Sequence, residues 1–133
     1  KGKLAFSTAA SFGSEDFDLN HNVPDSGWSI FLEGKKISYT GDTGACENLE
    51  KLAKGADVLI SETLPFNTSY QWFHLSADQA ARVAKKSGVK KLFLTHFSPL
   101  MFPSRKSRKD AEKDARKIFP NTFAAFDGLT VEV

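Results

Sequence analysis

Three ionisable side chains follow apolar runs of this sequence, at the points where strands would end. Asp42 comes soon after the run ISYT, Glu62 follows VLIS, and His96 follows LFLT. In open α/β sheets the carboxyl ends of the strands form one edge, and sites are commonly built there. Taken alone, an Asp within Gly41-Asp42-Thr43-Gly44 is most simply a turn residue. Because three such groups occur at three strand ends, we expect a functional site at that edge instead.

The residue types at these positions are those of a metal-dependent hydrolytic site. Imidazole nitrogen and carboxylate oxygen are ligands that zinc accepts, and the two oxygens of an Asp can bridge two ions. Two ions about 3.5–4 Å apart can stabilise the charge that builds on a phosphoryl or acyl group. The chain has two further histidines, His21 and His74. Since His74 lies on the same connection as Glu62, this carboxylate can orient the imidazole as a proton donor to a leaving group.

The elements that would position these residues alternate between strands and helices. Two apolar runs around Glu33-Gly34-Lys35-Lys36 predict a hairpin with strands at 28–32 and 36–40. Further on, the pattern predicts a short helix ending at Gly55, a buried strand ADVLISE, a helix from the Ser76–Gln79 capping box to Gly88, a strand KKLFLTHFS, a helix over 107–118 and two short strands in FAAFDGLTVEV. This order indicates an α/β layered fold.

Composition sets the broad class. The 133 residues, 41% hydrophobic with 12 Phe, are enough for one domain with a core of its own. A formal net charge of +2 gives no overall field that would attract nucleic acid. The single cysteine, Cys46, suits a reducing compartment, and no apolar run is long enough to span a bilayer. We therefore expect a cytoplasmic protein that does not enter membranes.

Four stretches of the sequence occur together in a known family: NHNVPDSGWSIFLEGKKISYTGDTG, DVLISETLP, HLSADQAARVAKKSGVKKLFLTHFSP and DGLTVEV. From Asn20 onward the chain resembles the C-terminal half of a metallo-β-lactamase-fold domain of the ribonuclease Z-like branch. The resemblance implies that residues 1–133 are a single domain, half of an αββα sandwich. Its mixed β-sheet would carry helices packed on the outer face.

The same resemblance implies roles for the candidate residues. His21 matches the third-motif histidine ligand, Asp42 the aspartate that bridges two ions, and His96 the last histidine ligand. The ions would be Zn²⁺, with Mn²⁺ as an alternative. Glu62 and His74 resemble the family's glutamate and histidine that support proton transfer to the leaving oxygen.

The sequence departs from the family in lacking its N-terminal HxHxDH motif. Each ion would then keep only two protein ligands, below the three or four of ordinary zinc sites. Residue 1 is Lys and the only Met is Met101, which also suggests a longer parent chain. We expect an N-terminal half in the same or another polypeptide, or self-association through the exposed sheet face. The alternative is a non-catalytic remnant or interaction domain that retains part of the site.

Two further departures concern the substrate. Little more than one hairpin joins His21 to Asp42, where tRNA-processing members insert a long arm, and the family's Arg-Tyr after THFS is replaced by Pro99-Leu100-Met101-Phe102. A small phosphodiester or other ester is therefore the favoured substrate. The basic run SRKSRKD could bind nucleic-acid phosphates, but a solvated start of a helix is the favoured interpretation. Together, these features predict a metal-dependent, phosphodiesterase-like hydrolase.

Overall fold

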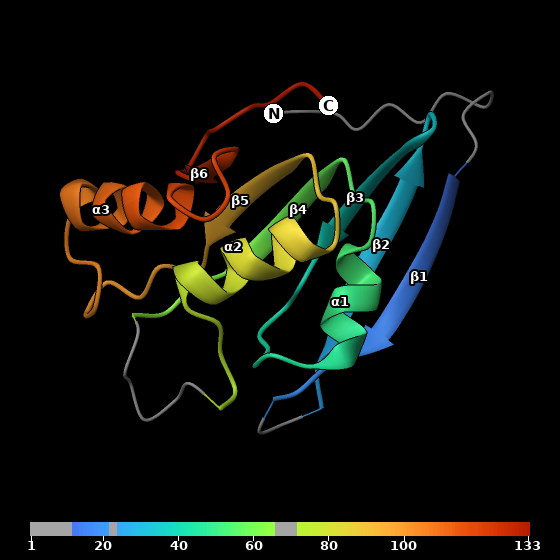
Figure 1. Ribbon diagram of the computed structural model, residues 1–133, viewed down its shortest axis with the longest axis horizontal. Helices are drawn as coiled ribbons and strands as arrows, with labels where there is room; N and C mark the ends of the chain where they lie inside the picture. Colours follow the sequence, from blue (N-terminus) through green and yellow to red (C-terminus); the bar gives the residue numbers. More distant parts are fainter. Residues whose placement is uncertain (1–11, 22–23, 66–71) are drawn as a thin grey trace.

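The structure is a computed structural model of the 133-residue chain and describes residues 12–21, 24–65 and 72–133. Within this part of the chain, six strands form one mixed sheet in the order β1-β2-β3-β4-β5-β6, with three helices beside it (Figure 1). The elements in chain order are β1 Phe12–Asp18, β2 Ser26–Leu32, β3 Lys35–Tyr39, α1 Glu47–Ala53, β4 Val58–Glu62, α2 Ala77–Lys86, β5 Lys91–Thr95, α3 Arg105–Arg116 and β6 Thr122–Ala124.

The sheet changes from antiparallel to parallel at β3. Strands β1, β2 and β3 are antiparallel neighbours, whereas β3, β4, β5 and β6 run parallel to one another. Glu33 and Gly34 connect β2 to β3 and have φ angles of 52° and 75°. Positive φ at both central residues is typical of the tight hairpin turn that suits the twist of the sheet. The predicted hairpin is therefore confirmed, within two residues at each strand boundary.

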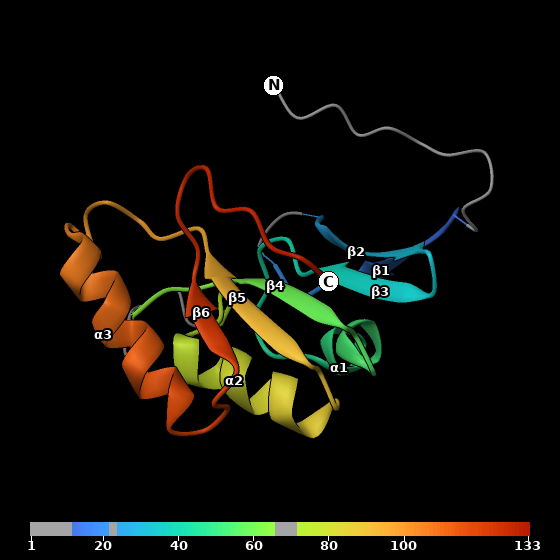
Figure 2. The ribbon, with the colours of Figure 1, turned by 90° about the horizontal axis from the view of Figure 1, so that it is seen from above.

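All three helices pack on the same face of the sheet, as Figure 2 shows. Helix α2 buries four alanines against this face, and their small side chains let its backbone approach Leu59 of β4 and Leu92 of β5. The predicted capping box is present, because Ser76 Oγ accepts from Gln79 N and Gln79 Oε1 accepts from Ser76 N. These two hydrogen bonds satisfy backbone donors that the first helical turn leaves unpaired.

The opposite face of the sheet carries a row of apolar side chains. Cross-strand pairing aligns Trp28, Tyr39, Ile60, Phe93 and Phe123 across five strands, and residues paired in this way point to the same face. Trp28 is 47% exposed and Tyr39 is 43% exposed. No helix of the described residues covers this face (Figure 2). The exposed sheet face expected from the sequence is therefore present at Trp28 and Tyr39, whereas Phe93 in the same row is buried.

One predicted strand is wrong, and one strand was not predicted. The C-terminal stretch FAAFDGLTVEV forms one strand, β6, rather than two, because the chain turns at Asp127-Gly128 and its last residues pair with no strand. Lys91 Nζ instead donates to the carbonyl of Glu132, which holds that segment across the end of β5. Strand β1 was not predicted, because its largely polar sequence carries no strand signal of its own. It forms a strand by pairing with β2.

Helix α3 begins two residues earlier than predicted. Ser104 caps it, accepting from Ser107 N, and this cap places Arg105 and Lys106 inside the helix. None of the helices in the described residues has the length and apolar character that crossing a bilayer requires.

Candidate metal centre

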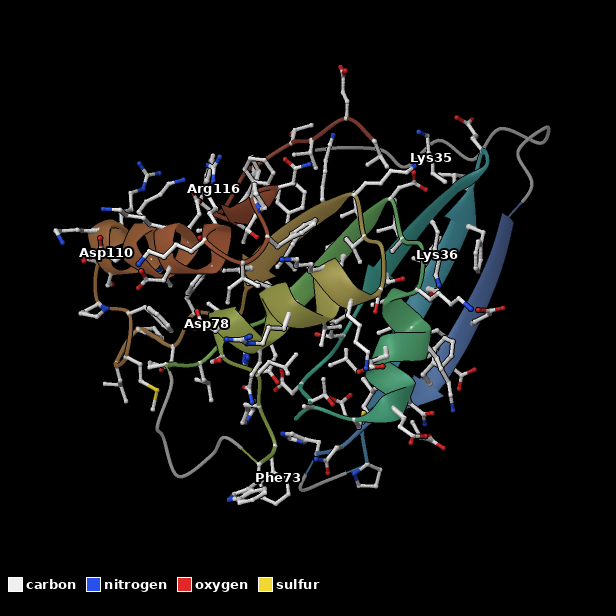
Figure 3. The ribbon with its side chains drawn as sticks, in the orientation of Figure 1. Lys35, Lys36, Phe73, Asp78, Asp110 and Arg116 are labelled. Atoms are coloured by element: carbon white, nitrogen blue, oxygen red, sulfur yellow. The ribbon has the colours of Figure 1, made fainter. Side chains whose placement is uncertain are left out.

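The parallel strands bring the predicted site residues to one edge of the sheet. Asp42 lies three residues beyond β3, Glu62 is the last residue of β4, and His96 directly follows β5. Because these strands are parallel neighbours, their carboxyl ends meet at the same edge. Figure 3 labels Phe73 near this edge and Lys35 at the opposite one, where β3 starts. The neighbour of Phe73, His74, comes from the connection between β4 and α2.

Four of these side chains form a compact group. Ligand atoms of Asp42, Glu62, His74 and His96 all lie within 4.8 Å of one another. His96 Nδ1 is 3.2 Å from Asp42 Oδ1 and 3.8 Å from Glu62 Oε2. Two carboxylates and two imidazoles at this spacing form a donor set that a divalent cation accepts.

Glu62 is the buried member of the group, with no exposed surface. The pKa of its carboxyl is raised from the usual 4.5 to about 8, chiefly by burial and also by the nearby Asp42 carboxylate, while the Thr43 backbone N–H and His96 act in the opposite direction. Thr43 N donates to Glu62 Oε1 at 2.5 Å. A buried carboxylate without a strong counter-charge favours its neutral form. A cation bound at this edge would reverse that preference.

Glu62 and His74 form the pair that the sequence suggested. Their hydrogen bond joins Glu62 Oε2 to His74 Nδ1 at 2.7 Å. Because Nδ1 is engaged by the carboxylate, Nε2 is the ring nitrogen left for another partner. The carboxylate therefore fixes which nitrogen of His74 is available for proton transfer.

His21 lies beside this group without being one of its four members. Its ring is 5.1 Å from that of His74, centroid to centroid, in an edge-to-face arrangement. The Nδ1 atom of His21 is buried and has no hydrogen-bond partner among the described residues. Buried polar atoms are nearly always paired, so an unpaired one requires an explanation such as an absent ion.

A close approach at Gly44 holds the segments of the site together. Gly44 N donates to the carbonyl of Asn20, next to His21, and Asn20 Nδ2 donates to the carbonyl of Trp72. A Cβ atom at Gly44 would lie 2.2 Å from that Trp72 oxygen. Only glycine fits here, because any side chain would force apart the segments that carry His21, Asp42 and His74.

The backbone of His96 has a φ of 56°, in the left-handed region. Non-glycine residues rarely adopt this conformation, which costs roughly 1–3 kcal/mol and often occurs at functional sites. The turn directs the His96 imidazole toward Asp42 immediately after β5. This strain is therefore consistent with a positioning requirement for the side chain.

Sequence reasoning missed Asp25 as a positioning residue. Its Oδ2 accepts from Asp42 N at 2.8 Å, while its Oδ1 accepts from Ser26 N at 2.8 Å. Asp25 therefore fixes the turn that presents the Asp42 side chain. The stretch PDSG in the sequence is a turn signal, but no pattern shows that this carboxylate reaches across 17 residues to another turn.

A cavity of about 460 Å³ adjoins the site and is lined by His74 and His96 together with Phe97, Pro99 and Met101. The segment that replaces the Arg-Tyr pair of the family thus forms an apolar wall beside the two histidines. No lysine or arginine is among the residues that line this cavity.

Comparison with known proteins identifies the family. Residues 3–97 match the family model described as "Beta-lactamase superfamily domain", and the chain belongs to this family. Ribonuclease Z of Acaryochloris marina is 40% identical over 105 residues, which are 75% of this chain and 33% of that protein. Ribonuclease Z of Methanothermobacter thermautotrophicus is 42% identical over 106 residues, 76% of this chain and 33% of that protein. The chain thus spans about a third of the length of these relatives.

Solved structures confirm the expected fold. The metallo-beta-lactamase fold protein YhfI of Bacillus subtilis aligns with a TM-score of 0.76 at 24% identity, over 95% of this chain and 52% of that one. Human tRNase Z, short form, aligns with a TM-score of 0.68 at 27% identity, over 96% of this chain and 45% of that one. The described residues are an α/β fragment of the metallo-β-lactamase fold, as the sequence motifs predicted.

Proposed function

We propose that this chain is the C-terminal half of a metal-dependent hydrolase with phosphodiesterase-like chemistry, in which His21, Asp42 and His96 hold the metal ions. The observation that carries the proposal is the gathering of four potential ligand side chains within 4.8 Å at one sheet edge, two of them Asp42 and His96. Membership of the beta-lactamase superfamily and similarity to ribonucleases Z support it.

The residues present fit a pair of ions. Asp42 has two carboxylate oxygens, so it can contact both ions at once. The unpaired, buried Nδ1 of His21 gains a partner if an ion binds next to it. This mixture of nitrogen and oxygen donors suits Zn²⁺, and Mn²⁺ is the alternative. When bound, the ions would supply Lewis acidity and neutralise charge at a phosphoryl group.

Glu62 and His74 have the proton-handling role in this proposal. The Glu62 carboxylate holds His74 through Nδ1 and stabilises the imidazolium when the ring is protonated. His74 then donates the proton from Nε2 to the oxygen of the leaving group. Because Glu62 is buried and fixed by Thr43 N, the His74 ring has little freedom to leave this orientation.

The ligand count calls for a partner segment. His21 and Asp42 would hold one ion while Asp42 and His96 hold the other, and zinc usually has three or four protein ligands. We infer that an HxHxDH-bearing segment, in the same or a separate polypeptide, completes the site and packs on the open sheet face. Self-association through that face is the alternative cover. On this proposal residues 1–133 act as one domain of a cytoplasmic enzyme whose substrate is a small phosphodiester or another ester.

Zinc binding by the purified chain tests the proposal. Isothermal titration should show zinc binding that Asp42→Ala and His96→Ala weaken at least about tenfold, a loss typical when metal-site residues are removed. Asp110→Ala is the matched control, because Asp110 is an exposed aspartate on α3 outside the site. Absence of zinc binding, or equal binding by all variants, would favour the non-catalytic remnant instead.

A further inference from the structure

A second hollow adjoins the candidate metal centre on the side of α3. It has a volume of about 310 Å³, and His96, Phe97, Arg108 and Phe126 are among the residues that line it. His96 thus borders both this hollow and the cavity it shares with His74. A volume of this size accommodates a phosphate group together with part of a sugar.

The arginine in this hollow has a fixed position and free donors. The Arg108 guanidinium lies over the ring of Phe97, with Cζ 5.7 Å from the ring centroid, and Phe97 directly follows His96. No ion pair of Arg108 is recorded among the described residues, and its buried Nε has no hydrogen-bond partner. An arginine held by stacking beside a site, with unused donors, is suited to planar, bidentate recognition of an anion.

Two neighbouring lysines of α3 differ from Arg108 in this respect. Lys106 pairs with Asp110 at 2.8 Å, and Lys109 pairs with Glu112 at 2.7 Å. Arg105 is a second unpaired cation within the described residues, and it lies over the ring of Phe126, with Cζ 5.6 Å from the centroid. It also lines a smaller adjoining hollow with Arg108. Acids of α3 thus engage Lys106 and Lys109, whereas among the described residues neither arginine, nor Lys113 farther along the helix, has an ion pair within 4.0 Å.

One carboxylate faces the same hollow. Asp127 lines it from the turn after β6, but no ion pair within 4.0 Å joins Asp127 to Arg108 in the described residues. The guanidinium of Arg108 is therefore not engaged by this carboxylate. An anion in this hollow would lie beside both Arg108 and His96, and His96 also lines the cavity at the metal centre.

The geometry points to Arg108, supported by Arg105, as the binding group for a second phosphate of the substrate, next to the phosphodiester that is cleaved. This inference rests on the proposed function, since it takes the cleaved group to lie at the His96 edge. It names the substrate class as phosphodiesters that carry a further phosphate, such as a short oligonucleotide end. Arg108 is then a specificity-determining residue rather than one that handles the reaction itself. It would supply the positive charge that the apolar wall at Pro99 and Met101 lacks.

The test measures binding to the metal-free 133-residue chain, so that it does not depend on metal binding or hydrolysis. The dinucleotide pTpT, which carries a terminal phosphate, is compared with TpT, which lacks one, while NMR follows the arginine Nε–H signals. We expect pTpT to bind about 3- to 10-fold more tightly than TpT and to shift the Arg108 signal, as a charge-assisted hydrogen bond would. Arg108→Gln should remove this difference, whereas Arg108→Lys should retain part of it because the charge remains.

Lys113→Gln is the matched control, since it removes the same charge from an exposed position of the same helix. Near-ultraviolet circular dichroism checks that each variant is folded. The inference is overturned if Arg108→Gln and Lys113→Gln have equal effects, or if pTpT leaves the Arg108 signal unmoved. Inorganic phosphate is the third probe: if it shifts the Arg108 signal as strongly as pTpT does, the hollow recognises free phosphate and the assignment to substrate is wrong. Failure of zinc binding, by contrast, would affect only the proposed function.

Discussion

At the scale of single residues, the candidate site depends on a carboxylate that is buried before any ion is present. Glu62 has no exposed surface. Its carboxyl is hydrogen-bonded to His74 and to Thr43 N, and it lies 3.8 Å from Nδ1 of His96, which in turn approaches Asp42. Two acids and two imidazoles in this small space repel or attract one another according to their protonation. The protonation of Glu62 therefore couples the stability of the fold to the charge of the site.

This coupling predicts an unusual pH dependence for the metal-free chain. The folded-state pKa of Glu62 is raised to about 8, so the unfolded chain loses this proton first as pH rises above the usual 4.5. The contribution of Glu62 to the free energy of unfolding is therefore fully present below pH 4.5 and is lost as the pH rises to about 8. The free energy of unfolding should fall by at most about 1.4 kcal/mol per pH unit over this range. Urea unfolding in EDTA should show this decline, and Glu62→Gln should reduce it. Parallel pH profiles for the two proteins would contradict the assignment.

A second residue-scale prediction concerns Gly44. Gly44→Ala places a Cβ atom against the Trp72 carbonyl, so the segments carrying His21 and Asp42 must shift. We expect a loss of about 1–3 kcal/mol in the free energy of unfolding, as for other overpacked positions, together with weaker zinc binding. Gly34→Asn is the control, because nothing lies within 4 Å of a Cβ there and Asn tolerates positive φ. Equal zinc affinities for Gly44→Ala and the unmodified chain would show that the close approach does not position the site.

At the scale of elements, features encoded within a few neighbouring residues could be predicted from the sequence, whereas most features that depend on contacts between distant residues could not. Helix α2 was predictable because its capping box and the Gly88 that follows it are encoded within a few residues. The convergence of Asp42, Glu62 and His96 was predictable because parallel strands align their carboxyl ends. Strand β1 and the role of Asp25 were not, since each depends on a partner distant in sequence. The second C-terminal strand was wrong for a related reason: β-type residues form a strand only where the chain places them beside a partner strand, and the turn at Asp127-Gly128 does not do so.

Asp57 connects three strands at the edge opposite the site. Its carboxylate accepts from Lys36 N at the start of β3 and from Lys90 Nζ just before β5, each within 2.8 Å. The hydrogen bond from Lys90, then that from Lys36, holds the pKa of Asp57 below its usual 3.8. This pattern fixes the register of the parallel strands from their amino ends, and so positions the site residues at their carboxyl ends.

Asp57→Asn should therefore destabilise the fold by about 1–3 kcal/mol, since it weakens charge-assisted hydrogen bonds at a buried position. The group with a lowered pKa stabilises the folded state above pH 3.8 and loses that contribution as pH falls through the folded-state value. The difference between the two proteins should then shrink in acid, as measured by denaturant unfolding. Asp110→Asn, which removes an exposed helical ion pair, is the control and should change stability by less than about 0.5 kcal/mol. A constant difference down to pH 2 would argue against the charge as its cause.

At the scale of the whole molecule, one face of the sheet is covered and the other is open. The helices cover the face that carries Leu59 and Leu92, while the row that includes Trp28 and Tyr39 lies on the open face. An apolar surface of this kind is characteristic of an interface. The chain spans 45% to 52% of two structures of the same fold. On the function proposed above, a single second segment would supply both apolar cover for the open face and further ligands at its edge.

This explanation predicts how activity depends on the missing ligands. The isolated chain should hydrolyse bis-p-nitrophenyl phosphate weakly or not at all with added Zn²⁺ or Mn²⁺, because incomplete coordination places the reacting groups poorly. A segment carrying the HxHxDH motif, fused or added as a separate polypeptide, should raise the rate by at least about 100-fold, the size of a general acid–base contribution. Asp42→Ala should abolish that gain, since its carboxylate would contact both ions, whereas Asp110→Ala should retain it. Rapid turnover by the isolated chain that survives Asp42→Ala would place the chemistry elsewhere on the molecule.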